Sequence, residues 1–441
     1  MQPSAVVVLA AGEGTRMRSA TPKVLHAICG RTLLGHVLAA VEPLGAANVL
    51  VVVGHGRDAV MASLPSWATP VVQDAQHGTG HAVRLALETV PDLTGTVLVL
   101  YGDMPLLTTA TLTSLLDAHD GDLTLLTARE PDPTGYGRVL RDATGRVTGI
   151  VEERDATPEQ QAIDEINAGV YAFDAAALRS ALGKVSADNA QGEEYLTDVV
   201  GILGGGVGVV ADAVEVSGVN DRAQLAAAGA ALRDRTLATL MRNGVAVTDP
   251  STTWVDVTVT VEPDATIEPF TRLRGTTTVA SGARVGPYAE VVDAVVGPDA
   301  TAGPFVYLRP GAVLGPRSKA GTYVEIKAST VGADSKVPHL SYVGDATIGE
   351  RTNVGAATVF VNYDGKDKHQ TVVGDDVRIG SDTMLVAPVE VGDGAYTAAG
   401  SVITKNVPPG ALGVGRAYQR NVEGWVARRR GGAATTKGAD E

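Results

Sequence analysis

The chain has 441 residues, of which 44% are hydrophobic, so it can bury more than one core and is not disordered as a whole. Its 36 basic and 50 acidic residues give a net charge of −14, which provides no extended positive surface for a nucleic acid or an anionic membrane. One cysteine excludes an intrachain disulfide, and no run approaches the roughly 20 apolar residues of a membrane span. We therefore expect a cytoplasmic protein without a nucleic-acid or membrane partner.

The first half of the chain alternates short apolar runs with helical patterns. The runs Val6–Leu9 and Val97–Leu100 are typical of buried strands, whereas Leu33–Leu44 and Thr79–Val90 show the spacing of helices. This alternation predicts a three-layer α/β domain with a mainly parallel sheet over residues 1–220.

A single helix is expected next, over residues 221–244. Asp221 stands near its start, leucines recur at helical spacing within it, and Gly244 marks its end. We interpret this segment as the linker between two domains.

The second half shows a period of six. Small and mostly aliphatic side chains recur at every sixth position, apart from slips of one residue and one longer gap between Val354 and Val373. The positions are Val255, Val261, Ile267, Leu273, Val279, Val285, Val291, Val296, Ala302, Leu308, Leu314, Ala320, Ile326, Val331, Val337, Val343, Ile348, Val354, Val373, Ile379, Leu385, Val391, Thr397 and Ile403.

One inward side chain per hexad predicts a triangular β-solenoid with three hexads per coil. We expect its narrow interior to exclude aromatic side chains, and Gly, Asp, Asn or Pro to turn its corners. The gap in the pattern is expected to form a protruding loop. We place this domain at residues 245–425 and expect residues 426–441 to form a disordered tail.

A glycine loop with two basic residues follows the first predicted strand. It reads Leu-Ala-Ala-Gly-Glu-Gly-Thr-Arg-Met from Leu9, and Pro22-Lys23 follows shortly after. Gly12 and Gly14 let backbone N–H groups approach a phosphate, while Arg16 and Lys23 supply positive charge. The loop lacks the third glycine of a dinucleotide fingerprint and the Gly-Lys-Ser/Thr of a Walker loop. A Gly-x-Gly alone could be a plain turn, but the added basic residues favour a phosphate site.

This loop resembles the signature of the sugar-nucleotide pyrophosphorylases, L-A-A-G-x-G-T-R-M followed by P-K. Further motifs of one bacterial family follow in order: Gln73, Gly78–Ala82, Tyr101-Gly102-Asp103, Gly135–Arg138, Val151-Glu152, Glu165–Gly169 and Gly218–Asn220. Together with the hexapeptide second half, the chain to about Trp425 is similar to the bifunctional GlmU family. The resemblance implies an N-terminal Rossmann-like nucleotidyltransferase domain and a C-terminal left-handed parallel β-helix.

The resemblance also implies two consecutive reactions. Glucosamine-1-phosphate would be N-acetylated from acetyl-CoA in the C-terminal domain. N-acetylglucosamine-1-phosphate and UTP would then give UDP-N-acetylglucosamine and pyrophosphate in the N-terminal domain, with Mg²⁺ as cofactor. The product would serve peptidoglycan and cell-wall synthesis. The family further implies a homotrimer formed through the β-helix, with acetyl-transfer sites shared between subunits.

By the same resemblance, the uridyltransferase site has four parts. One of them, formed by Gly137, Glu152 and Asn167 with Tyr101-Gly102 nearby, would hold the hydroxyls and amide of N-acetylglucosamine. Gln73, Gly78 and Thr79 would read uracil, Asp103 and Asn220 would bind Mg²⁺, and Arg16 and Lys23 would be the catalytic cations. The full set for UTP and UDP-N-acetylglucosamine is Leu9, Ala10, Ala11, Gly12, Lys23, Gln73, Gly78, Thr79, Tyr101, Gly102, Asp103, Gly137, Glu152, Asn167 and Asn220. Because the attacking phosphate oxygen is already an anion, the reaction needs no general base.

The acetyltransferase site implied by the resemblance centres on His339. The sugar amine must lose a proton when it attacks the thioester, and an imidazole that titrates near neutrality is a suitable base. Acceptor-binding residues would be Arg309, Lys327, His339, Tyr342 and Asn353, and acetyl-CoA would be held by Ala356, Asn362, Tyr363, Ser381, Ala399 and Arg416. Two residues depart from the family pattern. Ala357 replaces a glycine, and His77, which stands at a usually apolar position, is interpreted as incidental.

Other interpretations remain open from the sequence. The chain could be a pyrophosphorylase whose solenoid serves only assembly or regulation, but His339 argues against it. It could be a non-enzymatic trimeric scaffold, but the phosphate loop with Asp103 and Asn220 argues against that. A nucleotide-sugar glycosyltransferase usually carries Asp-x-Asp, whereas Met104-Pro105 follows Asp103. Taken singly, Asp103 could cap a helix and Glu152 could lie in a solvated hairpin.

Overall fold

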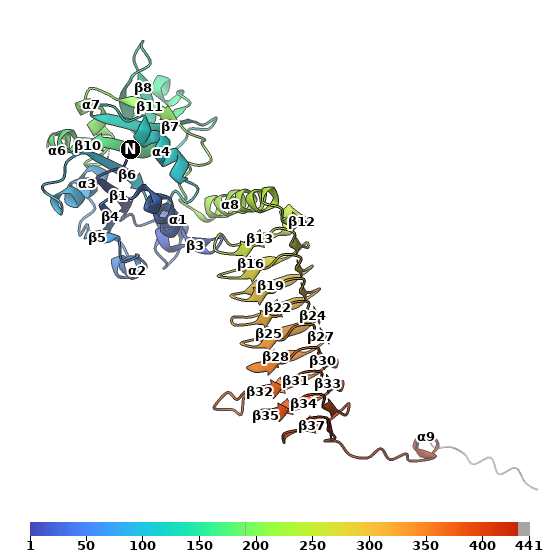
Figure 1. The fold of residues 1–441 in the computed structure, drawn as a ribbon. Helices are drawn as coiled ribbons and strands as arrows, with labels where there is room; N and C mark the ends of the chain where they lie inside the picture. Colours follow the sequence, from blue (N-terminus) through green and yellow to red (C-terminus); the bar gives the residue numbers. More distant parts are fainter. Residues whose placement is uncertain (190, 431–441) are drawn as a thin grey trace, which may run out of the picture. The chain divides into compact units, whose positions relative to one another are not determined.

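The computed structural model describes residues 1–189 and 191–430 of the chain. Within them, the chain forms two compact units (Figure 1). The first contains residues 1–260 and 272–276, and the second contains residues 261–271 and the described chain from Thr277 onward. Residues 245–260, which the sequence assigned to the second domain, are grouped with the first unit.

The first unit is built on a sheet with the strand order β11-β7-β10-β6-β1-β4-β5. The strands are β1 (Ala5–Ala10), β4 (Asn48–Val53), β5 (Thr69–Val72), β6 (Thr96–Tyr101), β7 (Leu123–Arg129), β10 (Glu165–Asp174) and β11 (Val207–Val210). Strand β1 runs parallel to both β4 and β6, and all six of its residues are buried. A strand buried on both faces needs helices on both sides of the sheet.

Helices do cover both faces. Side chains of α1 (Leu33–Val41) and α4 (Thr109–Asp117) share one core with Val6 and Val8. Side chains of α3 (Thr79–Glu88), α6 (Ala175–Leu182) and α7 (Asp198–Ile202) share another with Val7. The predicted three-layer α/β architecture is therefore confirmed. Shorter elements are α2 (Arg57–Ala62), α5 (Pro158–Gln161), β2 (Ala27–Ile28) and β3 (Arg31–Thr32).

The sheet is mainly parallel, as predicted, since β1 is parallel to β4 and β6, β4 to β5, and β11 to β7, but one strand runs in the opposite direction. Strand β10 is antiparallel to both β6 and β7. The chain enters β10 after the antiparallel hairpin of β8 (Arg138–Arg141) and β9 (Val147–Val151), without a long crossover helix. Parallel pairing requires such a crossover, but apolar periodicity alone does not give the direction of a strand.

The expected linker helix is α8 (Arg222–Arg242). The Asp221 side chain caps it by accepting a hydrogen bond from the Gln224 backbone N–H at 2.8 Å, and Gly244 follows its end with a positive φ of 92°. Leu232 and Leu237 are buried, and Leu232 packs with Ile28 of β2. Helix α8 therefore belongs to the first unit and packs there against β2.

The second unit is a stack of coils whose short strands form three parallel sheets (Figure 1). One sheet contains β15 (Thr266–Ile267), β18 (Arg284–Val285), β21 (Thr301–Ala302), β24 (Lys319–Thr322), β27 (Lys336–His339), β30 (Asn353–Val354), β33 (Arg378–Ile379), β36 (Tyr396–Thr397) and β38 (Leu412–Gly413). The second contains β19 (Ala289–Val292), β22 (Val306–Leu308), β25 (Val324–Lys327), β28 (Tyr342–Gly344), β31 (Val359–Val361), β34 (Met384–Val386) and β37 (Val402–Ile403). The third contains β17 (Thr278–Val279), β20 (Val295–Val296), β23 (Val313–Leu314), β26 (Thr330–Val331), β29 (Ala346–Ile348), β32 (Thr371–Val373) and β35 (Val389–Val391).

This arrangement confirms the hexad prediction. Ile267 pairs with Val285, which pairs with Ala302, so one coil takes 18 or 17 residues. Every predicted hexad position is at most 9% exposed. The remaining short strands are β12 (Ala246–Val247), β13 (Trp254–Val255), β14 (Thr260–Val261) and β16 (Arg272–Arg274).

One corner of the β-helix carries a ladder of aromatic side chains, which we had not expected. Phe270, Tyr288, Phe305 and Tyr323 have φ values between 52° and 57°, and their rings stack at 4.7, 4.8 and 5.2 Å between centroids. The prediction that Gly, Asp, Asn or Pro turn the corners is therefore wrong here. Stacking between successive coils offsets the cost of a left-handed backbone at these bulky residues.

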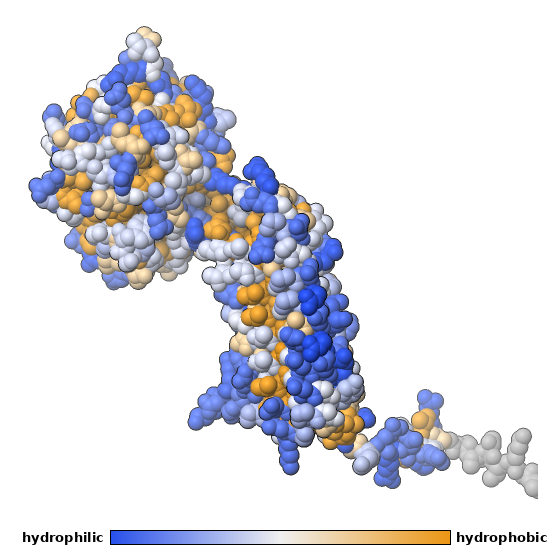
Figure 2. Space-filling view, in the orientation of Figure 1, coloured by the Kyte–Doolittle hydropathy of each residue, from blue (hydrophilic) through white to orange (hydrophobic). Residues whose placement is uncertain are grey.

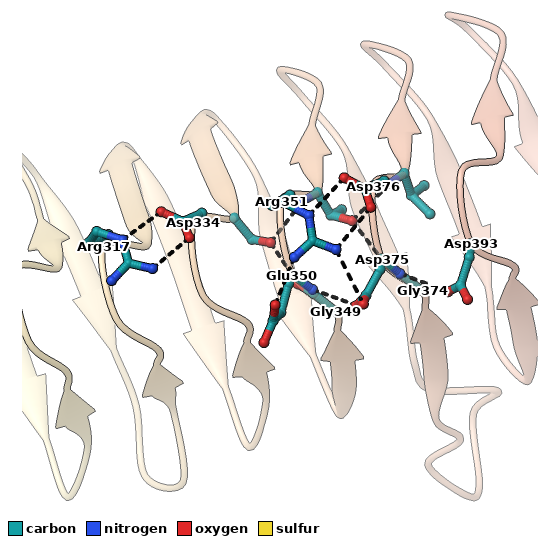
Figure 3. A network of polar contacts seen from close by, with 12 residues as sticks. Arg317, Asp334, Gly349, Glu350, Arg351, Gly374, Asp375, Asp376 and Asp393 are labelled. Carbon is teal, nitrogen blue, oxygen red and sulfur yellow. Dashed lines mark hydrogen bonds and ion pairs between the residues drawn. The ribbon is translucent and has the colours of Figure 1, made fainter.

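A second corner carries alternating charges (Figure 3). Arg317 forms a bidentate pair with Asp334 at 2.8 and 2.7 Å. Arg351 contacts Glu350 at 2.8 Å, Asp376 at 2.9 Å and Asp375 at 3.6 Å. These residues belong to successive coils, so the ladder joins coils at their edges. Figure 2 shows hydrophilic and hydrophobic side chains in separate columns along this part of the chain.

The interior also differs from expectation at one position. Phe360, six residues after Val354, is fully buried and pairs with Leu385 in the next coil. The aromatic ring continues the hexad pattern, so the prediction that aromatic side chains are excluded is wrong. The protruding loop is correspondingly shorter and spans residues 362–370, between β31 and β32 (Figure 1).

Most of the expected disordered tail, from residue 431 on, lies outside the described residues. Its first residues belong to a short helix, α9 (Trp425–Arg429). Among the described residues, no helix combines the length and the apolar character needed to cross a membrane.

Candidate functional sites

The first unit contains a cavity of about 330 Å³ at the carboxyl ends of β1 and β6. Most of the predicted nucleotide-binding residues line it: Leu9, Ala10, Ala11, Gly12, Lys23, Gln73, Gly78, Thr79, Tyr101, Asp103 and Asn220. Four further lining residues were not predicted: Val24, Gln76, Ala82 and Glu193. Ligands of open α/β sheets bind at this edge, because the loops after parallel strands meet there.

The glycine loop brings Lys23 to the cavity. Gly14 has a φ of 63°, and a Cβ at this residue would lie only 2.6 Å from the Cβ of Lys23. Glycine is therefore required for the loop to pack closely over Lys23. Arg16, in the short 3₁₀ helix Thr15–Met17, is exposed and does not line the cavity.

Lys23, Asp103 and Asn220 meet at one point of the cavity wall. The Lys23 ammonium donates to the Asp103 carboxylate and, at 3.1 Å, to Oδ1 of Asn220. The side chains of Lys23 and Asp103 are only 14% and 16% exposed. Two residues 117 positions apart in the sequence therefore present oxygen atoms to the same cation.

This donor set fits a magnesium ion. Mg²⁺ prefers oxygen ligands, uses few from the protein, and completes its shell with water and substrate phosphates. The Asp103 carboxylate and the Asn220 side-chain carbonyl supply two such oxygens, and both already face a positive charge. We find no group of three or more His, Cys, Asp or Glu side chains suited to a metal in the described part of the chain.

The residues predicted to read the base lie beside helix α3. The Gln73 side chain is buried, and its Nε2 lies 3.2 Å from the Gly78 carbonyl oxygen and 3.0 Å from Nδ1 of His81. Gln76 donates a hydrogen bond to the Ala11 carbonyl at 2.9 Å and thereby ties this loop to the glycine loop. Gln76 belongs to no predicted motif, and only its position near Gln73 could have pointed to it.

The predicted sugar-binding residues form a neighbouring group. Asn167 accepts from the Gly169 N–H at 3.0 Å and donates to the Tyr171 hydroxyl at 2.7 Å, and its backbone N–H donates to the Gly137 carbonyl. A Cβ on Gly137 would lie 3.6 Å from both carboxyl oxygens of Glu152.

Glu152 directly follows the β8–β9 hairpin, and it is half-buried rather than solvated. It accepts a hydrogen bond from the Thr197 hydroxyl at 3.0 Å. Burial raises the pKa of its carboxyl, and the Thr197 hydrogen bond opposes this only in part. Burial also raises the pKa of the nearby Tyr101 hydroxyl, so this tyrosine stays neutral. Gly102, Gly137, Glu152 and Asn167 do not line the 330 Å³ cavity itself.

In the second unit, three of the predicted acceptor residues, Arg309, Lys327 and Tyr342, belong to a polar cluster on the sheet of β22, β25 and β28. Arg309 pairs with Glu325 at 2.8 Å, and Lys327 pairs with Asp345 at 3.0 and 3.1 Å. The Asn362 amide donates to Asp345 and, at 3.4 Å, to the Tyr342 hydroxyl. Asp345 and Glu325 were not predicted, because their role depends on which coils are neighbours.

Charges within this cluster influence one another. Although burial alone would raise the pKa of the Asp345 carboxyl, hydrogen bonds from Lys327 and Asn362 hold it below its usual value. The hydrogen bond to Asp345 raises the pKa of Lys327. Lys327 in turn lowers the pKa of Lys368, a residue of the protruding loop that the sequence did not indicate. Arg309 and Lys327 are thus each paired with a carboxylate, and Lys368 brings a third basic side chain close to them.

Four of the six predicted acetyl-CoA residues, Ala356, Ser381, Ala399 and Arg416, lie in one column along a corner, whereas Asn362 and Tyr363 lie outside it. Backbone hydrogen bonds run from Ala357 N–H to His339 O, from Asp382 N–H to Ala356 O and from Gly400 N–H to Ser381 O. His339, Ala356, Ser381 and Ala399 therefore occupy equivalent positions in successive coils. Arg416 continues the column, since its Cδ would lie 4.0 Å from a Cβ on Gly400.

Three further residues need separate mention. Asn353 lies on another sheet than Arg309 and Lys327, in register with Lys336 and Arg378. Tyr363 is 56% exposed in the protruding loop. Ala357 has a φ of 60°, a left-handed conformation that explains why glycine is usual there.

Comparison with known proteins identifies the family. Residues 6–163 match the family model of the MobA-like NTP transferase domain, and residues 370–405 match six repeats of the bacterial transferase hexapeptide model. A protein of Streptomyces avermitilis named bifunctional protein GlmU is 57% identical over 469 aligned residues, covering 100% of this chain and 97% of the relative. The chain belongs to the GlmU family.

Other GlmU proteins give the same result. A bifunctional protein GlmU of Streptomyces coelicolor is 56% identical, again over 100% of this chain and 97% of its own. That of Corynebacterium glutamicum is 51% identical over 99% of this chain and 96% of its own. The predicted family is thus confirmed. The chain carries both parts of a GlmU protein, and it is a bifunctional transferase with a nucleotidyltransferase and an acetyltransferase domain.

Proposed function

We propose that the two units carry out consecutive reactions at two separate sites. The second unit N-acetylates glucosamine-1-phosphate from acetyl-CoA, and the first joins N-acetylglucosamine-1-phosphate to UTP, giving UDP-N-acetylglucosamine and pyrophosphate for cell-wall synthesis. The observation that carries this proposal is that each unit contains its own cluster of paired basic and acidic side chains at predicted site positions. Lys23 and Asp103 meet in the first unit, and Arg309 and Lys327 lie on one sheet in the second.

In the first unit, binding and alignment account for catalysis. The sugar phosphate supplies an anionic oxygen that attacks the α-phosphorus of UTP, so the protein must bring two anions together and stabilise the added charge. Lys23 lies at the cavity wall for this task, while Arg16 would have to turn toward the phosphates from its exposed position. Asp103 and Asn220 would hold Mg²⁺, which neutralises phosphate charge when bound. Tyr101, Gly102, Gly137, Glu152 and Asn167 are proposed to hold the N-acetylglucosamine.

In the second unit, His339 is the proposed general base. Its exposed side chain stands at the head of the acetyl-CoA column, next to the sheet that carries Tyr342. The imidazole would take the proton of the attacking amine while Arg309 and Lys327 hold the sugar phosphate. Acetyl transfer is direct, because Cys29 lies in the other unit.

A homotrimer in the cytoplasm completes the proposal. The hexapeptide repeats support oligomerisation through the β-helix, proposed to be left-handed at residues 245–425. The position of Asn353 gives further support, since a second chain would be needed to bring an Asn353 side chain to the face of Arg309 and Lys327.

Two single substitutions in the full chain test the two-site proposal. Asp103→Asn keeps the shape of the side chain but removes its charge, and it is expected to abolish uridylyl transfer while acetyl transfer continues. His339→Ala is expected to do the opposite. The matched control is Asp117→Asn, which changes an exposed carboxylate outside both sites and should leave both rates unchanged.

Each reaction is measured separately, by CoA release with glucosamine-1-phosphate and by pyrophosphate release with N-acetylglucosamine-1-phosphate and UTP. Omission of Mg²⁺ should stop the second reaction only. Loss of both activities in either folded variant would show that the sites are not independent. Absence of both activities in the unmodified protein would contradict the proposal as a whole.

A further inference from the structure

The buried amide of Gln73 is held in one orientation by two acceptors. Its Nε2 faces the Gly78 carbonyl oxygen at 3.2 Å, and a carbonyl oxygen can only accept hydrogen bonds. The nitrogen, and not the oxygen, of the amide must therefore point toward Gly78. The same Nε2 lies 3.0 Å from Nδ1 of His81, so this ring nitrogen must also be an acceptor. The hydrogen-bond network thus requires a neutral His81 that carries its proton on Nε2.

The surroundings of His81 favour this neutral form. His81 lies near the start of helix α3, and its ring meets the ring of His77 edge to face, with 5.1 Å between centroids. Burial lowers its pKa most, Arg84 and His77 lower it further, and Glu194 and Glu88 oppose this without reversing it. Glu194 is itself bound to Arg84 at 2.9 Å, which limits its effect on His81. His77 is therefore part of this arrangement and not incidental.

Both hydrogens of the Gln73 amide are consumed by these two acceptors. Only its Oε1 remains for a ligand in the cavity that Gln73 lines. An amide oxygen accepts hydrogen bonds and cannot donate them. Uracil carries a hydrogen on N3, whereas the corresponding nitrogen of cytosine is an acceptor, so an Oε1 that faces N3 would match the first base and repel the second.

We propose that His81 is a positioning residue that locks the Gln73 amide with its oxygen toward the nucleobase and so makes the site select uracil over cytosine. This inference rests on the proposed function, in which Gln73 reads the base. His81 does not contact the substrate. It acts by withholding the N–H side of the amide from the cavity, where that side would bind N3 of cytosine.

The test compares UTP with CTP in the full-length protein carrying two substitutions of His81. His81→Phe keeps a ring against His77 but has no acceptor, and it is expected to lower the UTP/CTP ratio of kcat/KM by about tenfold, the size of one hydrogen bond, mainly through KM for UTP. His81→Asn places an amide oxygen near the position of Nδ1 and is expected to keep the ratio close to that of the unmodified protein.

A Gln73→Leu background separates positioning from a general structural effect. Once the Gln73 amide has been removed, adding His81→Phe should not change the base preference further. An unchanged UTP/CTP ratio in His81→Phe, or an equal loss in His81→Phe and His81→Asn, would overturn the inference. If His81→Phe does not fold, ¹⁵N spectra of the unmodified protein decide: a neutral Nε2–H imidazole supports the lock, and any other form at neutral pH overturns it. Failure of the unmodified protein to use UTP would refute the proposed function instead.

Discussion

Replacing Phe360 by alanine should destabilise the β-helix far more than any change at its surface. The ring is fully buried in line with the hexad positions and pairs with Leu385 in the next coil. Truncating a buried Phe to Ala costs about 3–5 kcal/mol, because apolar contacts are lost and a cavity remains. Since about 1.4 kcal/mol is a factor of ten, the unfolding equilibrium should shift by on the order of 10²–10³ or more.

The destabilisation should also affect acetyl transfer and not uridylyl transfer. Asn362, which donates to Asp345 in the acceptor cluster, follows Phe360 by two residues. Acetyl transfer is therefore expected to disappear at a lower temperature or guanidinium concentration than in the unmodified chain, whereas uridylyl transfer keeps its original midpoint. The assay follows both activities and circular dichroism through the same unfolding series.

Phe270→Ala is the matched control. Phe270 also belongs to the β-helix, but it is 49% exposed, and its ring stacks on that of Tyr288. Its truncation loses about 0.5–1.5 kcal/mol of stacking and only part of the burial term, so it should cost clearly less than Phe360→Ala. If the two variants were destabilised equally, or if Phe360→Ala cost less than its exposed counterpart, the conclusion that Phe360 fills the interior of a coil would be refuted.

Two further predictions concern the first unit. Gly78→Ala should raise KM for UTP and lower the stability of the unit, because Gly78 has a φ of 105° and its new Cβ would collide with the Glu194 carbonyl oxygen. Gly149→Ala is the control and should change neither quantity, because nothing lies within 4 Å of its new Cβ. An equal effect of both substitutions would argue against a steric cause. Burial raises the pKa of Glu152, so as the pH falls it gains a proton earlier than an ordinary glutamate and loses acceptor capacity. As the pH falls, KM for N-acetylglucosamine-1-phosphate should therefore begin to rise at a higher pH than an unperturbed carboxyl would give, and Glu152→Gln should remove this dependence. If KM of Glu152→Gln still rises at low pH in the same way, the rise belongs to another group.

The sequence predicted the parts of the fold that repeat. Hexad positions such as Ile267, Val285 and Ala302 reveal the coil because the same local pattern recurs many times, and the structure buries all of them. The direction of β10 was not predictable in this way, since an apolar strand looks the same in both directions. The aromatic corner was also missed, because a left-handed backbone at Phe305 is favourable only when Tyr288 stacks on it from the preceding coil.

The same contrast between local sequence patterns and contacts distant in the sequence applies to the sites. The family resemblance assigned Asp103 and Lys23 to one site, and the structure brings them together at the edge of the sheet where the loops after parallel strands meet. Asp345 carried no motif, and its role appears only when coil register sets it against Lys327 and Asn362. His81 lay within a predicted motif, but its function as an acceptor for Gln73 requires knowing which atom faces which.

The regular coil spacing of the β-helix sets distances along its axis in equal steps. Neighbouring strands lie about 4.8 Å apart, so the three coil steps from His339 to Ala399 span roughly 14 Å along the axis. Length in this domain is therefore counted in whole coils, whereas a shift of one hexad moves a side chain to a different sheet. An insertion of 18 residues between Ala356 and Ser381 would lengthen the acetyl-CoA column by one step and preserve its direction. An insertion of six would leave the length almost unchanged but move the later residues off the column.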